Sequence, residues 1–122
     1  MSLSLSLQFN QIRAVEGQKE PVILHIAVRN PSEAQKSELA TVMIKIPFSL
    51  GFDKAGLMRE TKRRIGFVKP GEEKSIPIPI YCKPSTREGI YPIEVIAWTH
   101  DENYSKTVSE EKQKADLRVI KP

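Results

Sequence analysis

The sequence is poor in the residues that build disulfide frameworks and metal sites. Its 122 residues include one cysteine, Cys82, and two histidines, His25 and His100. One cysteine excludes an internal disulfide bond, and a chain of this length can bury a core without one. We therefore expect a single domain spanning residues 1–122 that folds in a reducing compartment, and we predict a cytoplasmic location.

Long apolar runs are also missing. The first nine residues alternate apolar and polar side chains, without a basic start or a continuous apolar stretch. This pattern favours a strand over a signal peptide. No segment elsewhere is apolar for long enough to cross a membrane, so we expect no membrane span.

The sequence has no glycine-rich phosphate loop, no zinc-ligand spacing and no Ser-His-Asp pattern. Cys82 ends an apolar run and is expected to pack as a small hydrophobe. His100, Asp101 and Glu102 are consecutive, and adjacent strand residues point in different directions, so we interpret them as solvated turn residues. We predict no catalytic site, no metal and no cofactor. The alternative is an enzyme, which would have to use a reactive thiol at Cys82 or a site built from His100, Asp101 and Glu102.

The clearest pattern that is present covers residues 68–98. A turn at Pro70-Gly71 precedes two apolar alternations, one through Ile76, Ile78, Ile80 and Cys82 and one through Tyr91, Ile93, Val95 and Ala97. These alternations predict two neighbouring strands. Pro77 and Pro79 both remove an N–H group from the same side of the first strand, which predicts that this strand lies at a sheet edge.

Alternation elsewhere predicts an all-β protein with no convincing helix. The predicted strands cover residues 2–9, 20–30, 39–46, 59–68, 75–82, 90–100 and 114–120. Residues 48–58 are irregular but apolar enough to pack over one end, and residues 99–113 are expected to form a long charged hairpin connection. About seven strands separated by turns predict an immunoglobulin-like antiparallel β-sandwich.

Two motifs support this fold. Tyr91, at the start of a strand, resembles the tyrosine corner of immunoglobulin-like sandwiches, whose hydroxyl bonds back to the preceding corner. Val68-x-Pro70-Gly71-Glu72, the Ile-x-Ile-x-Ile strand and Gly89-x-Tyr91-x-Ile93-x-Val95 together resemble the prokaryotic and archaeal immunoglobulin-like domains of the CARDB and NEW3 type, over residues 20–120. The resemblance implies a sandwich that carries no chemistry of its own.

Positive charge is concentrated in one segment. The net charge is +4, but residues 54–69 alone hold six basic residues and one acidic residue. Arg59, Lys62, Arg63 and Arg64 could bind nucleic-acid phosphates, an acidic protein or anionic lipid. They could instead protect a sheet edge from aggregation. Strand alternation would place Arg59 and Arg63 on one side and Lys62 and Arg64 on the other. Many charges, nine prolines and 13 isoleucines are typical of a thermophilic source, and we predict an archaeal or thermophilic protein.

Outward positions on three predicted strands form the other candidate site. Met43, Ile96, Trp98 and Ile120 would make an apolar patch rimmed by charge, and the single tryptophan is a natural hot-spot residue. The alternative is that residues 48–58 or 99–113 fold over these side chains. We predict a non-catalytic interaction module that binds itself or a protein partner through this face or through an open strand edge. Nucleic-acid binding through residues 59–64 is the alternative function.

Overall fold

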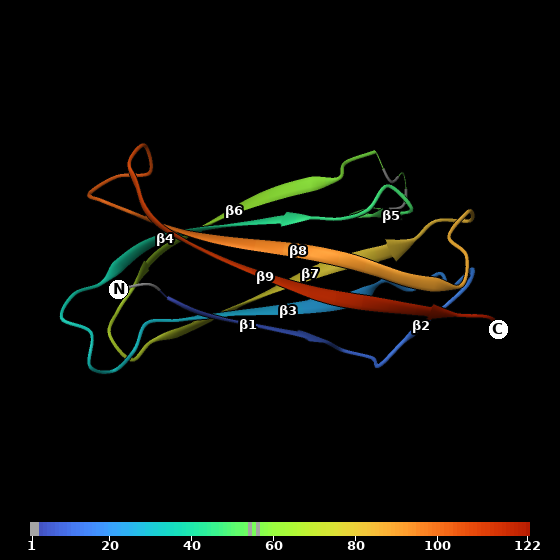
Figure 1. Cartoon of the computed structure of the whole chain (residues 1–122), viewed down its shortest axis with the longest axis horizontal. Helices are drawn as coiled ribbons and strands as arrows, with labels where there is room; N and C mark the ends of the chain where they lie inside the picture. The colour runs from blue at the N-terminus through green and yellow to red at the C-terminus, as the bar shows by residue number, and fades with distance from the viewer. Residues whose placement is uncertain (1–2, 54, 56) are drawn as a thin grey trace.

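The chain folds into two facing β-sheets, as the computed structural model of residues 3–53, 55 and 57–122 shows (Figure 1). Ser2 of the first predicted strand and Lys54 of the basic segment lie outside these residues. The four-stranded sheet has the order β1-β3-β7-β5, and the five-stranded sheet has the order β2-β9-β8-β4-β6. The strands are β1 (Ser4–Phe9), β2 (Ala14–Val15), β3 (Val22–Arg29), β4 (Glu38–Lys45), β5 (Leu50–Gly51), β6 (Glu60–Val68), β7 (Glu73–Cys82), β8 (Gly89–His100) and β9 (Thr107–Ile120).

The predicted all-β sandwich is confirmed, although the described residues form nine strands where about seven were expected. The two additional strands, β2 and β5, have two residues each and lie in segments that were predicted as connections. In the described part of the chain, no helix is long and apolar enough to span a membrane.

Alternation along the strands places one face of each sheet in a shared core. On β3, every second residue from Val22 to Val28 is fully buried, and the intervening side chains face outward. On β8, Ile93, Val95 and Ala97 likewise lie in the core, while Glu94 and Ile96 point to the other face. Burial of these aliphatic side chains is the main driving force for bringing the two sheets together.

β7 lies at a sheet edge over most of its length, as its prolines predict. On one side β7 pairs with β3 from Glu73 to Ile80, and on the other side β5 reaches only Tyr81 and Cys82. The backbone N–H and C=O of Ile23 both bond to Asn10 on the β1 side of β3. Pro79 stands opposite Ile23, and Pro77 stands opposite His25, two residues further along β3. Because the backbone groups of these β3 residues point toward β1, the proline nitrogens point away from β3, and no hydrogen bond between β3 and β7 is lost.

The hairpin β8–β9 corrects one prediction. Residues 99–113 are not a long connection, because β9 begins at Thr107 and pairs with β8 as far as His100. Apart from Val108, the first half of β9 is polar on both faces and therefore shows no apolar alternation in the sequence. It still forms a strand because β8 offers a long backbone edge, and because solvent reaches both faces at the rim of the sandwich.

Two local features shape the strands, a tyrosine corner at the start of β8 and a bulge within β6. The Tyr91 hydroxyl donates a 2.6 Å hydrogen bond to the carbonyl of Arg87, which confirms the predicted tyrosine corner. On β6, a bulge leaves Ile65 without a partner on β4, and the next residue, Gly66, has φ +84°. Glycine accepts this left-handed conformation without the steric cost that a side chain brings.

The segment between β4 and β6 corrects another prediction. Leu50 is buried and Phe52 packs against the core, so part of this segment docks as expected. Phe48 and Leu57, which were expected to pack with them, are 66% and 84% exposed. Both side chains project from the end of the sandwich.

Cys82 packs against the core at the end of β7, as predicted for a small hydrophobe. Burial raises the pKa of its thiol above the ordinary value, because desolvation disfavours the thiolate.

Two isoleucines on β8 give a matched test of the core. Ile93 is fully buried, whereas Ile90 is exposed. We expect Ile93→Ala to lower the free energy of unfolding by about 2–5 kcal/mol, because it removes buried methylene groups and leaves a cavity. Ile90→Ala should change it by less than about 0.5 kcal/mol. Urea denaturation of both variants and the wild type measures the difference, and equal effects would contradict this assignment of the two faces.

The raised pKa of Cys82 predicts slow alkylation. At any given pH, a smaller fraction of this thiol is ionised than in a free cysteine peptide, and the thiolate is the nucleophile. We expect iodoacetamide to label Cys82 more slowly than the peptide, with the rate rising at higher pH, when both are followed by mass spectrometry from about pH 7 to 10. If the alkylation rate of Cys82 increased at the same pH as that of the peptide, or at a lower pH, the pKa of the thiol would not be raised and the prediction would be wrong.

Candidate functional site

The outer face of the five-stranded sheet carries the site residues in two rows. Register fixes the rows, because cross-strand partners on one face stand side by side. From β6 through β4 and β8 to β9, one row is Lys62, Met43, Ile96 and Lys112, and the next is Arg64, Thr41, Trp98 and Glu110.

The structure corrects the predicted geometry of the apolar patch. Met43 and Ile96 are neighbours as expected, but they are only 7% and 4% exposed. Their row ends on both sides in a lysine, and such long side chains can lie across apolar neighbours while keeping the ammonium group in water. The flanking residue Lys112 belongs to residues 99–113, which the predicted alternative named as cover, but it lies on a strand of the same sheet and not in a loop.

Ile120 does not belong to this group. The partner of Ile96 on β9 is Lys112, so Ile120 is eight residues further along the strand, roughly 26 Å away at the usual strand rise. It pairs instead with Val15 of β2. The register of β9 decides this separation, and the sequence did not define that register.

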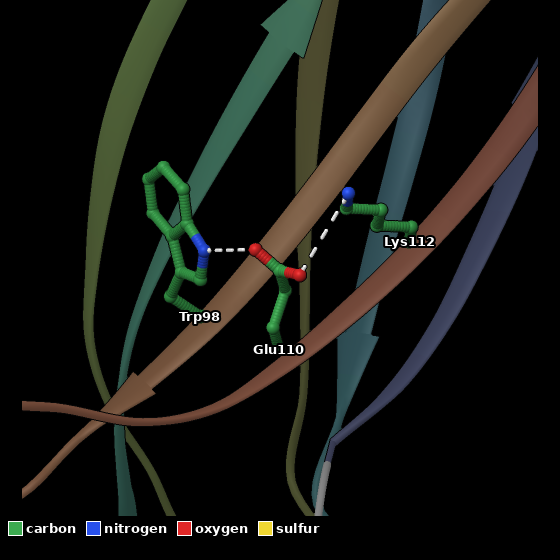
Figure 2. Close-up of polar contacts among 3 residues, drawn as sticks. All are labelled: Trp98, Glu110 and Lys112. Atoms are coloured by element: carbon green, nitrogen blue, oxygen red, sulfur yellow. Dashed lines mark hydrogen bonds and ion pairs between the residues drawn. The ribbon is translucent and has the colours of Figure 1, made fainter.

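Trp98 is half-buried and is held by its neighbours on the sheet (Figure 2). Its indole Nε1 donates a 2.8 Å hydrogen bond to Glu110 Oε1, and the other oxygen of Glu110 lies 3.8 Å from Lys112 Nζ. On the opposite side, Lys62 Nζ is 5.5 Å from the centre of the indole ring, a cation–π distance. These contacts hold the ring in one orientation.

Tyr104, which the sequence analysis did not select, completes the site. It lies in the turn between β8 and β9, and the Arg64 guanidinium is 4.5 Å from the centre of its ring. The ring also contacts His100 edge to face, with 5.3 Å between centroids. The sequence does show a tyrosine four residues after His100. Its place beside His100 and Arg64 follows only from the tight β8–β9 hairpin, which the sequence did not predict.

His100 is buried, which corrects its interpretation as a solvated turn residue. Its Nε2 lies 2.8 Å from Thr41 Oγ1 on β4, and its Nδ1 lies 3.4 Å from Thr107 Oγ1 on β9. Asp101 and Glu102 are exposed, as predicted for turn residues, and His25 is exposed on β3. Within the described residues, no group of three or more His, Cys, Asp or Glu side chains is placed to hold a metal ion.

These side chains surround a hollow of about 280 Å³ on the sheet face. The rings of Trp98 and Tyr104 and the cationic groups of Lys62 and Arg64 line it, together with His100 and two threonines. Such a lining can hold a flat or apolar group against the rings and an acidic group against the cations. The lining residues are Thr41, Lys62, Arg64, Trp98, His100, Tyr104 and Thr107.

The four basic residues of the predicted phosphate site do not all lie on one face of the sheet. Lys62 and Arg64 stand opposite Met43 and Thr41 on the outer face, whereas Arg63 stands opposite Val42 on the other side of β6. This confirms the predicted separation of Arg63 from Lys62 and Arg64. Arg59 lies just before β6, with its guanidinium 5.1 Å from the centre of the Phe48 ring.

A larger hollow, of about 510 Å³, lies at the end of the sheet beside the β8–β9 turn. Its lining carries three acidic side chains and one lysine, together with the apolar side chains of Ala34 and Val108. The lining residues are Glu33, Ala34, Gln35, Lys36, Glu38, His100, Asp101, Val108 and Ser109.

No protein family and no curated protein matches the sequence. Among solved structures, the chain is similar to a cohesin module from a Clostridium perfringens ATCC13124 family 33 glycoside hydrolase, with a TM-score of 0.59 and 8% identity over 99% of this chain and 98% of that one. It is also similar to Spo0M, a sporulation control protein from Bacillus subtilis, with a TM-score of 0.51 and 13% identity over 98% of this chain. The chain spans about half of Spo0M, 49% of its length. These likenesses show a shared β-sandwich fold, and neither indicates the CARDB or NEW3 families.

Proposed function

We propose that this protein is a non-catalytic binding module that takes a protein partner, a second copy or another chain, on the outer face of the five-stranded sheet. The observation that carries the proposal is the grouping of Trp98, Tyr104 and Arg64 around one hollow. Tryptophan, tyrosine and arginine are the residue types most enriched at the centres of protein interfaces.

The surroundings of Trp98 support this proposal. Its hydrogen bond to Glu110 orients the indole before any partner arrives, which reduces the entropy that binding would cost. Beyond the Met43 row, the next row on the same face alternates in sign through Glu60, Lys45, Glu94 and Lys114. An aromatic centre with a charged rim of both signs is the usual anatomy of a protein interface.

The likeness to the cohesin module also favours a binding role, because there a sandwich of this fold serves as one module of a larger protein. We propose a cytoplasmic location, since the single thiol requires no oxidising compartment. The archaeal or thermophilic source stays a prediction.

Trp98→Ala tests the face. The wild-type mass in light scattering after gel filtration, over a range of concentrations, shows whether the chain binds itself. If it does, we expect Trp98→Ala to weaken association by about 2 kcal/mol or more, roughly thirtyfold, because the central aromatic is lost.

Val108→Ala is the matched control, since Val108 is exposed on the same sheet outside the hollow. If the wild type is monomeric, cross-linking to cellular proteins is compared between the same variants. Partner capture that Trp98→Ala leaves unchanged would refute this face as the binding surface.

A second candidate is the binding of single-stranded nucleic acid, and one observation favours it. Lys62 lies over Trp98 and Arg64 lies over Tyr104, so each cation stands beside a ring on which a base could stack. Cationic groups beside stacking platforms are typical of single-strand binding surfaces.

The split of the basic residues gives this candidate a charge-matched test. Trp98 is the only tryptophan, so quenching of its fluorescence by an oligonucleotide reports on this site. We expect the double variant Lys62→Ala with Arg64→Ala to bind more weakly. The slope of log K against log salt concentration should also become shallower, by the amount that corresponds to about two phosphate contacts. Arg59→Ala with Arg63→Ala removes the same charge from elsewhere and should have little effect. Equal losses in both double variants would indicate non-specific attraction only.

A further inference from the structure

Exposed apolar side chains gather at one end of the sandwich. Strand directions place three connections there, residues 10–21, the described residues between 46 and 59, and residues 83–88, at the end where β5 and the C-terminus lie (Figure 1). Five of the seven large apolar side chains that are exposed among the described residues belong to this end: Ile12, Phe48, Leu57, Met58 and Ile90. Scattered exposed hydrophobes are common on protein surfaces, but a concentration at one end suggests a binding role.

Phe48 is held in its exposed position by the structure around it. It occupies the corner of a turn closed by a 3.0 Å hydrogen bond from Leu50 N to Pro47 O. Ile46 and Leu50, on either side of the turn, are anchored in the core. The turn carbonyls are bonded from the neighbouring connection, Phe48 O by Lys83 Nζ at 2.6 Å and Ser49 O by Thr86 Oγ1. Exposure of the ring is therefore a feature of the folded end and is not caused by a loose loop.

Two cations flank this ring. The Arg59 guanidinium lies 5.1 Å and Lys83 Nζ 5.5 Å from the centre of Phe48. Leu57 and Met58, which directly precede Arg59, are 84% and 53% exposed. We call Phe48, Leu57 and Met58 the apolar tip, and Arg59 and Lys83 its cationic collar.

We propose that this end of the sandwich docks onto an anionic lipid surface, with the apolar tip in the boundary layer and the collar at the level of the phosphates. Exposed apolar side chains with cationic groups beside them suit such a membrane, where anionic headgroup phosphates lie next to the acyl chains. The two hollows described above are lined by other residues, and the tip side chains are themselves exposed to solvent. This proposal is independent of the Trp98 face.

Vesicle sedimentation of the full chain tests the proposal. Vesicles of phosphatidylcholine alone are compared with vesicles that also contain phosphatidylserine, at low and high salt. We expect binding to the anionic vesicles only, with weakening at high salt as the collar is screened. Phe48→Ser with Leu57→Ser should lower the partition coefficient by about tenfold or more, because apolar area is withdrawn from the lipid.

The opposite end of the sandwich supplies a matched control. Phe67 and Val108 are also exposed, and they lie on β6 and β9 at the end away from the tip. Phe67→Ser with Val108→Ser should leave vesicle binding unchanged, and circular dichroism verifies that both double variants fold. Absence of wild-type binding, equal loss in both double variants, or full binding by the tip variant would overturn the proposal. So would a dimer in light scattering that only the tip variant abolishes, since the tip would then serve a second copy.

Discussion

The backbone ladder of β8 is the constraint on which the rest of the structure depends. β8 pairs with β9 along its whole length and with β4 from Glu94 to His100, so both of its edges are paired over that second part. Alternation along it then separates two roles. Ile93, Val95 and Ala97 point into the core, while Ile96, Trp98 and His100 point outward. A shift of one residue in this register would exchange the two sets, and burial of the aliphatic set prevents that shift.

Register also assembles the site around Trp98. Lys62, Thr41, Trp98 and Glu110 come from four different strands. They meet because β6, β4, β8 and β9 are neighbours in the sheet and pair in a register that aligns these positions. The sheet holds these side chains on a rigid scaffold, and the β8–β9 turn adds Tyr104. The site therefore joins precise strand positions to one residue from a connection. This combination is common where a rigid sheet supports a binding surface.

The fold and part of the site could be predicted from the sequence, since they depend on local rules. Period-two alternation predicted most of the strands, and the spacing of Pro77 and Pro79 predicted an edge. Alternation also separated Lys62 and Arg64 from Arg63. The burial of Met43 and Ile96 could not be predicted, because their flanking lysines come from strands 19 and 16 residues away along the chain. The length of β9 could not be predicted either, because its first half, apart from Val108, is polar on both faces.

The sequence by itself determined which side chains face inward on most strands, because that choice depends only on parity and hydrophobicity. Tertiary structure alone decided which outward residues became neighbours, because cross-strand contacts depend on register between distant segments. It placed Tyr104 beside Arg64 and separated Ile120 from Trp98. It also left Phe48 in solvent while Leu50, two residues later, entered the core. Both residues are apolar, but Leu50 pairs with Cys82 of β7, whereas Phe48 lies at the corner of a turn whose carbonyls accept hydrogen bonds from Lys83 and Thr86.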